Sequence, residues 1–244
     1  LISILFRARQ SVKGVFMEYS IKPIAHIEND FSCKFGIPRQ SGILDTLNSR
    51  IIMEPEFRSP EAFRGIEEFS HLWLLWRITL DEYRGFRATV RPPRLGGNKR
   101  LGVFATRSPY RPNSIGLSSV RLVGVEIDSG RGPILTVAGA DLVSGTPILD
   151  IKPYISYTDS HPDARCGFSE RAMGHELEVI IPEELRKIIP PDRQEALISI
   201  LKNDPRPGYH KDPERVYSFE FAGLGISFYV SGGVMTVIRI APLS

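Results

Sequence analysis

Short stretches of alternating apolar and polar residues, separated by Gly- and Pro-containing turns roughly every ten residues, limit the fold more than any other feature of this sequence. Before residue 165 such stretches predict strands over residues 20–28, 50–53, 69–78, 117–127, 134–140 and 148–154. They do not alternate with the long crossover helices that parallel strands need. We therefore expect a mainly β protein built on a small antiparallel sheet closed into a barrel, rather than a doubly wound α/β fold.

Two segments of this region carry further expectations. Residues 69–78 are almost all apolar or aromatic, which predicts a strand that is buried on both faces or nearly so. Ser59 and Pro60 offer an N-cap and a proline at the first helical position. A short helix is therefore expected to run to about residue 68.

The composition changes after about Arg165. The remaining elements predict a small α+β unit: a strand over 177–181, a helical stretch over 182–203 that breaks at Pro190, and strands over 217–221, 225–231 and 234–240. Met17 opens a more natural start than Leu1, so residues 1–16 are expected to be an upstream or artificially added segment. The expected domains are a barrel over residues 17–165 and an α+β C-terminal domain over residues 166–244.

The composition is that of an ordinary globular protein, with 42% hydrophobic residues among 244. No run of about 18 apolar residues occurs, so no membrane span is expected. Only two cysteines are present, Cys33 and Cys166, which favours a reducing compartment and a cytoplasmic location. Neither cysteine has a metal-binding or redox spacing, so both are expected to be structural.

Positive charge is concentrated in one part of the chain. Nine basic residues and no acidic residue lie between Tyr83 and Val125, although the net charge of the whole chain is only +3. They are Arg84, Arg87, Arg91, Arg94, Lys99, Arg100, Arg107, Arg111 and Arg121. Such a surface is suited to a polyanion, although charge density alone is equally explained by a solvated basic face.

Several common catalytic motifs are absent. Gly97 and Gly102 have the P-loop spacing, but Val103 and Phe104 follow in place of Lys and Ser or Thr. No dinucleotide fingerprint, Gly-x-Ser-x-Gly elbow or metal-ligand spacing among the five histidines occurs. The sequence therefore indicates a bound small molecule that brings its own reactivity, or no reaction at all, and no metal is expected.

Five blocks carry a resemblance to a known family: PRQ (38–40), FSHLW (69–73), VRPPRLGGNKRLGVFATRSPYRPNSIGLS (90–118), DLVSGTPILDIKPY (141–154) and DPRPGY (204–209). In this order they resemble the TsaA-like, TrmO-type family of tRNA methyltransferases. The resemblance implies a β-barrel that binds S-adenosylmethionine, a C-terminal domain that helps to hold tRNA, and a homodimer. It also implies methylation of the exocyclic N6 of threonylcarbamoylated adenosine, next to the anticodon of threonine tRNA.

The resemblance also implies a set of cofactor-binding residues: Pro38, Arg39, Gln40, His71, Leu72, Arg107, Leu117, Asp141, Leu142, Val143, Ser144, Gly145 and Thr146. The chemistry of the cofactor agrees with this set, because an arginine can form a forked pair with the methionine carboxylate and an aspartate can accept from the ribose diol or the ammonium. Leu72 and Leu117 would provide apolar walls for the adenine. From the residues alone, Asp141 is as well explained as a turn former that caps its own loop.

The sequence departs from the family at Ser144, where many members carry an acidic residue. If that acid holds the methyl donor, the affinity for the donor is altered in this chain.

The lone pair of the acceptor nitrogen is delocalised, so a base that removes the proton of this nitrogen would assist transfer of the methyl group. Asp141 and Tyr209 are the candidate catalytic residues, and the sequence does not choose between them. Tyr209 is equally suited to stacking on an unpaired anticodon-loop base or to packing within its Pro-rich loop. The expected RNA-binding residues are Arg91, Arg94, Lys99, Arg100, Arg111, Arg206 and Tyr209, aided by Lys202 and Lys211.

Two other classes of function stay open at this point. One is a non-catalytic RNA-binding or nucleotide-sensing β-barrel that keeps the binding site but does not turn over. The other is a structural dimer module whose basic face meets a different polyanion.

Overall fold

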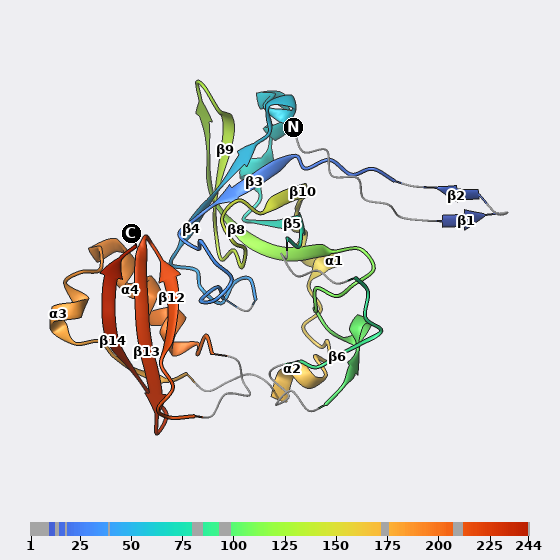
Figure 1. Ribbon diagram of the computed structural model, residues 1–244. Coiled ribbons are helices and arrows are strands. Elements are labelled where there is room, and N and C mark those ends of the chain that lie inside the picture. The colour runs from blue at the N-terminus through green and yellow to red at the C-terminus, as the bar shows by residue number, and fades with distance from the viewer. Residues whose placement is uncertain are drawn as a thin grey trace.

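The computed structural model describes residues 10–12, 15–17, 19–38, 40–79, 85–92, 99–171, 176–206 and 212–243. Six strands form a closed barrel (Figure 1): β3 (Ala25–Glu28), β4 (Asn48–Met53), β5 (His71–Arg77), β8 (Ile115–Asp128), β9 (Gly132–Ala138) and β10 (Pro147–Pro153). Their order is β10-β3-β4-β9-β8-β5, and all neighbouring pairs are antiparallel. The expected mainly β fold with an antiparallel barrel is confirmed.

Alternate residues of each strand fill the barrel. Ile27 pairs with Ile51, and Ile51 pairs with Leu135, so that three side chains with no exposed surface share one layer across β3, β4 and β9. Leu72 and Leu74 fill the barrel from β5. The two-residue period of a strand therefore accounts for the alternating sequence pattern from which the barrel is predicted.

The outer face of β5 differs from the expectation of burial on both faces. His71, Trp73 and Leu75 point outward and are only half-buried. The barrel core covers the inner face alone, whereas the outer face is covered in part by Tyr154, whose ring centroid lies 5.5 Å from that of Trp73. The indole N–H of Trp73 also donates to Asp159, at 2.8 Å.

The segment between β4 and β5 forms three short 3₁₀ helices in place of the single helix predicted from Ser59. These are η1 (Pro55–Phe57), η2 (Pro60–Phe63) and η3 (Ile66–Glu68). Gly65 has a φ of 86°, in the left-handed region, and it separates η2 from η3. Because a continuous right-handed helix cannot pass through such a residue, the segment stays as separate turns.

The segment between β5 and β8, residues 78–114, contains most of the nine basic residues that lie between Tyr83 and Val125 and is called the basic excursion. It contains β6 (Thr89–Val90), β7 (Leu101–Gly102) and the 3₁₀ helix η5 (Val103–Ala105). In Figure 1 this excursion, in green, lies below the barrel on the right, and the C-terminal sheet, in orange and red, lies below it on the left. The strands β6 and β7 are not among those predicted from the sequence.

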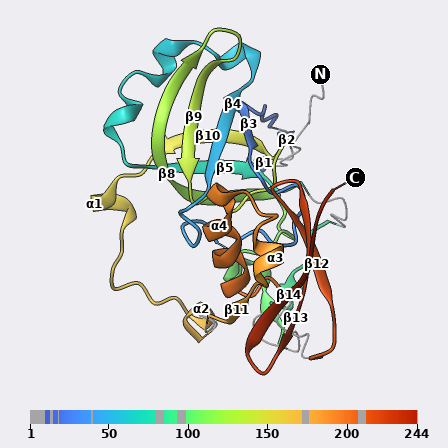
Figure 2. The ribbon, with the colours of Figure 1, turned by 90° about the vertical axis from the view of Figure 1, so that its left-hand side faces the viewer.

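The C-terminal part forms a four-stranded sheet in the order β11-β14-β13-β12. Its strands are β11 (Glu178–Ile180), β12 (Tyr217–Phe221), β13 (Leu224–Ser231) and β14 (Val234–Pro242), and its helices are α3 (Glu183–Arg186) and α4 (Pro191–Lys202). Both helices lie against the same face of the sheet (Figure 2). Ala196, Leu197, Ile200 and Leu201 form the buried stripe of α4, with the spacing of one helical face.

The core of this C-terminal sheet is completed by the loop between β3 and β4, residues 29–47. Phe31, Leu44 and Leu47 from this loop are buried in one cluster with Phe221 and Phe228. The ring centroids of Phe31 and Phe221 lie 5.7 Å apart. The loop therefore belongs to the barrel by its chain position and to the C-terminal core by its packing.

Four small elements remain. α1 (Ser156–Asp159) and α2 (Phe168–Arg171) follow the barrel, and the predicted domain boundary after residue 165 falls between them and stays a prediction. β1 (Gln10–Val12) and β2 (Val15–Met17) form a two-stranded ribbon in which Gln10 pairs with Met17. In the parts of the chain that the structure describes, no helix has the length and apolar character needed to cross a bilayer.

Candidate functional site

Asp141 follows β9 and reaches an inward-facing residue of the neighbouring strand β8. The hydroxyl of Ser118 donates to Asp141 Oδ1 at 2.5 Å, and the indole N–H of Trp76 donates to the same hydroxyl at 3.0 Å. Burial raises the pKa of the Asp141 carboxyl, and this effect is opposed by the Ser118 hydrogen bond and by the charge of Arg107. Asp141 is thus held in a fixed position and is a stronger base than an exposed aspartate.

Two further predicted residues lie beside Asp141. The Arg107 guanidinium donates from Nη1 to Gln40 Oε1 at 2.5 Å, and Arg107 is exposed. The backbone of Ser41, next to Gln40, is hydrogen-bonded to the Asp141 carboxylate. The structure therefore brings together Gln40, Arg107 and Asp141 from three separate loops of the chain.

The loops that carry Gln40 and Asp141 approach closely through two glycines. The Gly42 N–H donates to the Gly139 carbonyl at 2.9 Å. Gly139 has a φ of 82°, and a Cβ atom there would lie 3.2 Å from the Gly42 nitrogen. Only glycine combines this left-handed backbone with so close an approach.

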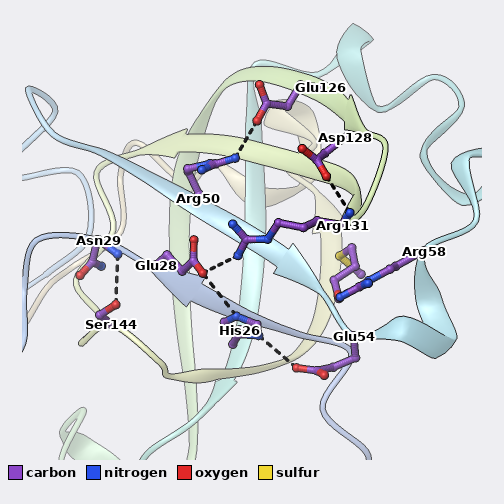
Figure 3. A network of polar contacts seen from close by, with 11 residues as sticks. His26, Glu28, Asn29, Arg50, Glu54, Arg58, Glu126, Asp128, Arg131 and Ser144 are labelled. Carbon is purple, nitrogen blue, oxygen red and sulfur yellow. Dashed lines mark hydrogen bonds and ion pairs between the residues drawn. The ribbon is translucent and has the colours of Figure 1, made fainter.

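The turn from Leu142 to Thr146 is fixed against the start of the β3–β4 loop. The Asn29 side chain donates to the Leu142 carbonyl at 2.9 Å, and the Asn29 backbone N–H donates to Ser144 Oγ at 3.3 Å (Figure 3). The Gly145 N–H donates to the Ile27 carbonyl at 2.7 Å. The Leu142 and Thr146 side chains are buried, those of Val143 and Ser144 are half-buried, and Gly145 is exposed.

The side chains of three other predicted cofactor residues have different surroundings. Leu72 has no exposed surface and belongs to the barrel core. His71 and Leu117 lie on the outer faces of the adjacent strands β5 and β8, where Leu117 is 51% exposed. The His71 ring packs against Tyr154, at 6.1 Å between centroids, and its Nδ1 lies 2.9 Å from Ser70 Oγ.

Two other predicted cofactor residues belong to the Gln40 segment. Pro38 is half-buried there, and Arg39 lies outside the described residues.

The predicted RNA-binding residues differ in their surroundings. Arg91, Lys99 and Arg100 are exposed, and Arg100 donates to Thr89 Oγ1 at 3.1 Å. Arg111 and Arg206 are half-buried, and their guanidinium groups have partners within the chain. Arg94, Tyr209 and Lys211 lie outside the described residues, and Lys202 is exposed at the end of α4.

The guanidinium of Arg111 donates to the carbonyls of Val103 and Thr106, at 3.3 and 2.7 Å. The guanidinium of Arg206 forms a forked pair with Asp204, at 2.8 and 2.9 Å, and this hydrogen bond raises its pKa. Arg111 therefore holds together residues 103–111, and Arg206 is paired with its near neighbour Asp204; the contact of either side chain with RNA stays a prediction.

A network of surface ion pairs covers β3, β4 and the β8–β9 hairpin (Figure 3). Its ion pairs are Arg131–Glu28 at 2.5 Å and Arg50–Glu126 at 2.8 Å, and His26 Nδ1 lies 3.1 Å from Glu54 Oε1. The Asp128 carboxylate accepts the N–H groups of Gly130 and Arg131, which lowers the Asp128 pKa and orders the hairpin turn. Exposed pairs of this kind contribute at most about 1 kcal/mol each to stability.

Four residues around the cluster were not predicted from the sequence: Ser118, Trp76, Ser41 and Asn29. A serine at an inward position of an alternating strand is a recognisable signal for Ser118, because a buried hydroxyl needs a partner. Asn29 gave no such signal for its role in the site, since its partners there, Leu142 and Ser144, lie more than a hundred residues away. Among the described residues, no group of three or more His, Cys, Asp or Glu side chains is placed to hold a metal ion, and Cys33 and Cys166 are thiols.

Comparison with known proteins agrees with this architecture. The family model described as the tRNA-methyltransferase O N-terminal domain matches residues 26–160, and the model of the TrmO C-terminal domain matches residues 175–243. A tRNA (adenine(37)-N6)-methyltransferase of Escherichia coli (strain K12) is 36% identical over 232 residues, which is 92% of this chain and 98% of that protein. A putative S-adenosylmethionine-dependent methyltransferase of Pseudomonas aeruginosa, RcsF, is 40% identical over 221 residues, which is 87% of this chain and 93% of that protein.

A crystal structure of TrmO from P. aeruginosa superposes with a TM-score of 0.75 at 34% sequence identity, and the match covers 93% of this chain and 98% of that one. The likeness thus extends over the barrel and the C-terminal sheet together. With both domain models matched in order and a relative aligned over nearly its full length, the chain belongs to the TrmO family of tRNA methyltransferases.

Proposed function

We propose that this chain is an S-adenosylmethionine-dependent tRNA methyltransferase that modifies the exocyclic N6 of N6-threonylcarbamoyladenosine at position 37 of threonine tRNA. The observation that carries the proposal is the cluster of Gln40, Arg107 and Asp141 in a chain with both TrmO domains. Relatives named tRNA (adenine(37)-N6)-methyltransferase support the position and the atom. The threonylcarbamoyl group, the threonine tRNA and a homodimeric assembly follow from the family resemblance.

The residues of the cluster fit the polar parts of S-adenosylmethionine. An exposed guanidinium at Arg107 suits a carboxylate, which it can hold through two parallel hydrogen bonds. A carboxylate at Asp141, next to the carbonyls of the turn from Leu142 to Thr146, suits an ammonium or a diol. Relatives named as dependent on S-adenosylmethionine or as binding it support the same cofactor.

When bound, the cofactor would supply a methyl group attached to a sulfonium sulfur, and this sulfur would leave as a neutral thioether. The chain then has two tasks, alignment of the acceptor nitrogen and removal of its proton. Alignment alone can contribute on the order of 7–11 kcal/mol to lowering the barrier. Asp141, whose pKa is raised by burial, is one candidate for the base, and Tyr209 is the other.

The proposed contact with tRNA phosphates is supported by Arg91, Lys99 and Arg100. These residues are exposed and come from a stretch without acidic residues. Their charges would contact phosphates of the anticodon arm and fix the position of the RNA without reading its sequence.

The test is methyl transfer from radiolabelled S-adenosylmethionine to threonine tRNA with and without the threonylcarbamoyl group. We expect label in the modified tRNA alone, and we expect Asp141→Asn to lower kcat by at least about tenfold. Binding of cofactor and tRNA without transfer would favour a nucleotide-sensing barrel instead. Absence of both binding signals would leave a structural module.

A further inference from the structure

Two phenylalanine rings are stacked on the surface of the basic excursion. Phe86 is 52% exposed and Phe104 is 70% exposed, and their ring centroids lie 6.4 Å apart with an interplanar angle of 28°. Single exposed apolar residues are common on protein surfaces. Two exposed rings in a stacked arrangement, on a loop rich in arginine, are a more specific feature.

The backbone holds both rings in place. The Val103 N–H donates to the Ala88 carbonyl at 3.0 Å, and the Arg87 N–H donates to the Tyr110 carbonyl at 3.1 Å. Next to the Val103–Ala88 bond, the β6–β7 ladder pairs residues 89–90 with residues 101–102. Val103 is 1% exposed and anchors η5, so its neighbour Phe104 is directed outward from a fixed turn.

One guanidinium lies beside the Phe104 ring, and a second lies over Tyr110, another ring of the same segment. The Arg111 guanidinium carbon lies 5.6 Å from the centroid of Phe104, and that of Arg87 lies 4.4 Å from the centroid of Tyr110. The Arg111 hydrogen bonds to the carbonyls of Val103 and Thr106 keep this guanidinium beside the stacked rings of Phe86 and Phe104, which together are called the stacking platform. Arginine next to exposed aromatic faces is the composition of surfaces that bind single-stranded nucleic acid.

We propose that Phe104, supported by Phe86, stacks on an unpaired nucleobase of the anticodon loop, with Arg87 and Arg91 beside the flanking phosphates. This inference rests on the proposed function, since it takes tRNA as the ligand. It assigns to Phe86 and Phe104 a role in holding the loop open, so that the target base can leave its neighbours. Stacking tolerates any base, because each base has a π face.

Charge favours RNA over a second copy of the chain as the occupant. The segment between Tyr83 and Val125 carries nine basic residues and no acidic residue. Of these, Arg87, Arg91, Lys99 and Arg100 are described and exposed in the segment that carries the two rings, so a two-fold contact centred there would place like charges opposite one another, which is unfavourable. A polyanion meets no such penalty.

The test uses the full chain and a synthetic anticodon stem-loop that carries 2-aminopurine at single loop positions. We expect Phe104→Ala and Phe104→Leu to weaken binding by about 5- to 150-fold and to abolish the fluorescence change at one loop position. Phe104→Tyr keeps a stacking face and should bind nearly as the wild type does. Tyr157→Ala is the matched control, since Tyr157 is 86% exposed on α1, outside the basic excursion.

Two further readouts separate the outcomes. The slope of log K against log salt should stay unchanged in Phe104→Ala, because the phosphate contacts are kept, and the affinity for S-adenosylhomocysteine should stay within twofold. Binding of the stem-loop by Phe104→Ala and Phe86→Ala as tightly as by the wild type would overturn the inference while leaving the proposed methylation intact. A shift of Phe104→Ala to a smaller species in sedimentation would also overturn it, by assigning the rings to a contact between copies.

If the wild type transfers no methyl group but still binds the stem-loop through Phe104, the proposed reaction fails and the stacking platform stands.

Discussion

Gly36 lies directly against the ring of Phe219, so closely that a Cβ atom at position 36 would overlap the ring carbons. This contact joins the β3–β4 loop to the C-terminal sheet. The same interface holds an ion pair between Asp30 and Arg193, at 2.7 Å. Because this loop also carries Gln40, the C-terminal sheet supports the loop that takes part in the candidate cofactor site.

Substitution of Gly36 by alanine is therefore expected to affect both folding and cofactor binding. The added methyl group would collide with Phe219, and the φ of 100° at this position disfavours any residue with a Cβ atom. We expect a loss of unfolding free energy of about 2–4 kcal/mol, from overpacking and backbone strain together. Urea unfolding measures this loss, and calorimetry with S-adenosylhomocysteine measures the affinity of the cofactor site.

Gly42→Ala is the matched control for this substitution. Gly42 has a φ of 78°, but no atom lies within 4 Å of a Cβ atom built there. It therefore carries the backbone strain without the collision, and its loss of stability should be about 1 kcal/mol. Equal losses in the two variants would show that the packing of Gly36 on Phe219 contributes nothing.

The Asp141 carboxyl gives a pH prediction with a defined sign. Burial raises its pKa above the value of about 3.9 of an unfolded aspartate. The folded state therefore holds the Asp141 proton more tightly than the unfolded state does. The protonated carboxyl consequently contributes to the free energy of unfolding at low pH, and this contribution is lost as the pH rises through the folded pKa. Asp141→Asn, which cannot ionise, should gain stability relative to the wild type as pH rises from about 3.9.

Urea unfolding of both proteins between pH 4 and pH 7 measures this difference. Asp150→Asn serves as a control, since Asp150 is paired with Lys152 at 2.9 Å on β10 and has a different environment. A stability difference between Asp141→Asn and the wild type that stays constant over this range would contradict a raised pKa at Asp141.

The strands with clear alternation could be predicted from the sequence, and the shortest ones could not. The predicted strand over residues 217–221 coincides with β12, where Tyr217, Phe219 and Phe221 face the core in turn. β6 and β7 have two residues each, too few for a period to be recognised. The helix predicted from Ser59 failed as a single element because Gly65 takes a left-handed conformation, which a sequence pattern alone does not reveal.

The candidate site also contains residues that could be predicted from the sequence and contacts that could not. Gln40, Arg107 and Asp141 followed from the family resemblance, and the structure places them together. The contact of Asp141 with Ser118 depends on how β8 and β9 pair in the barrel, which is a property of closure rather than of local sequence. For Leu117, the two-residue period of β8 places the side chain on the opposite face from Ser118.

Arg107 provides a test of the cofactor site itself. Arg107→Lys keeps the charge but loses the planar fork that suits a carboxylate. Because hydrogen bonds to charged groups contribute about 1.5–3 kcal/mol, we expect the dissociation constant of S-adenosylhomocysteine to rise by roughly ten- to a hundredfold. Calorimetry measures the change. Arg50→Lys, at an exposed pair with Glu126 2.8 Å away, is the matched control and should leave the affinity unchanged.

Charge reversal in the basic excursion separates RNA binding from cofactor binding. Lys99 and Arg100 are both described and exposed, whereas Arg94 lies outside the described residues. Lys99→Glu with Arg100→Glu should weaken tRNA binding by at least about tenfold and reduce the salt slope by about 1.4 to 1.8, because two phosphate contacts are lost. Filter binding over a range of salt concentrations measures both quantities.

The same double variant should bind S-adenosylhomocysteine as the wild type does, since neither residue belongs to the cluster around Asp141. Arg186→Glu with Lys187→Glu, on the C-terminal unit at α3, is a control with the same change of net charge. If both double variants lost tRNA affinity equally, the effect would come from net charge and not from the excursion. If Lys99→Glu with Arg100→Glu lost cofactor and tRNA affinity together, the excursion would be a structural support of the cofactor site.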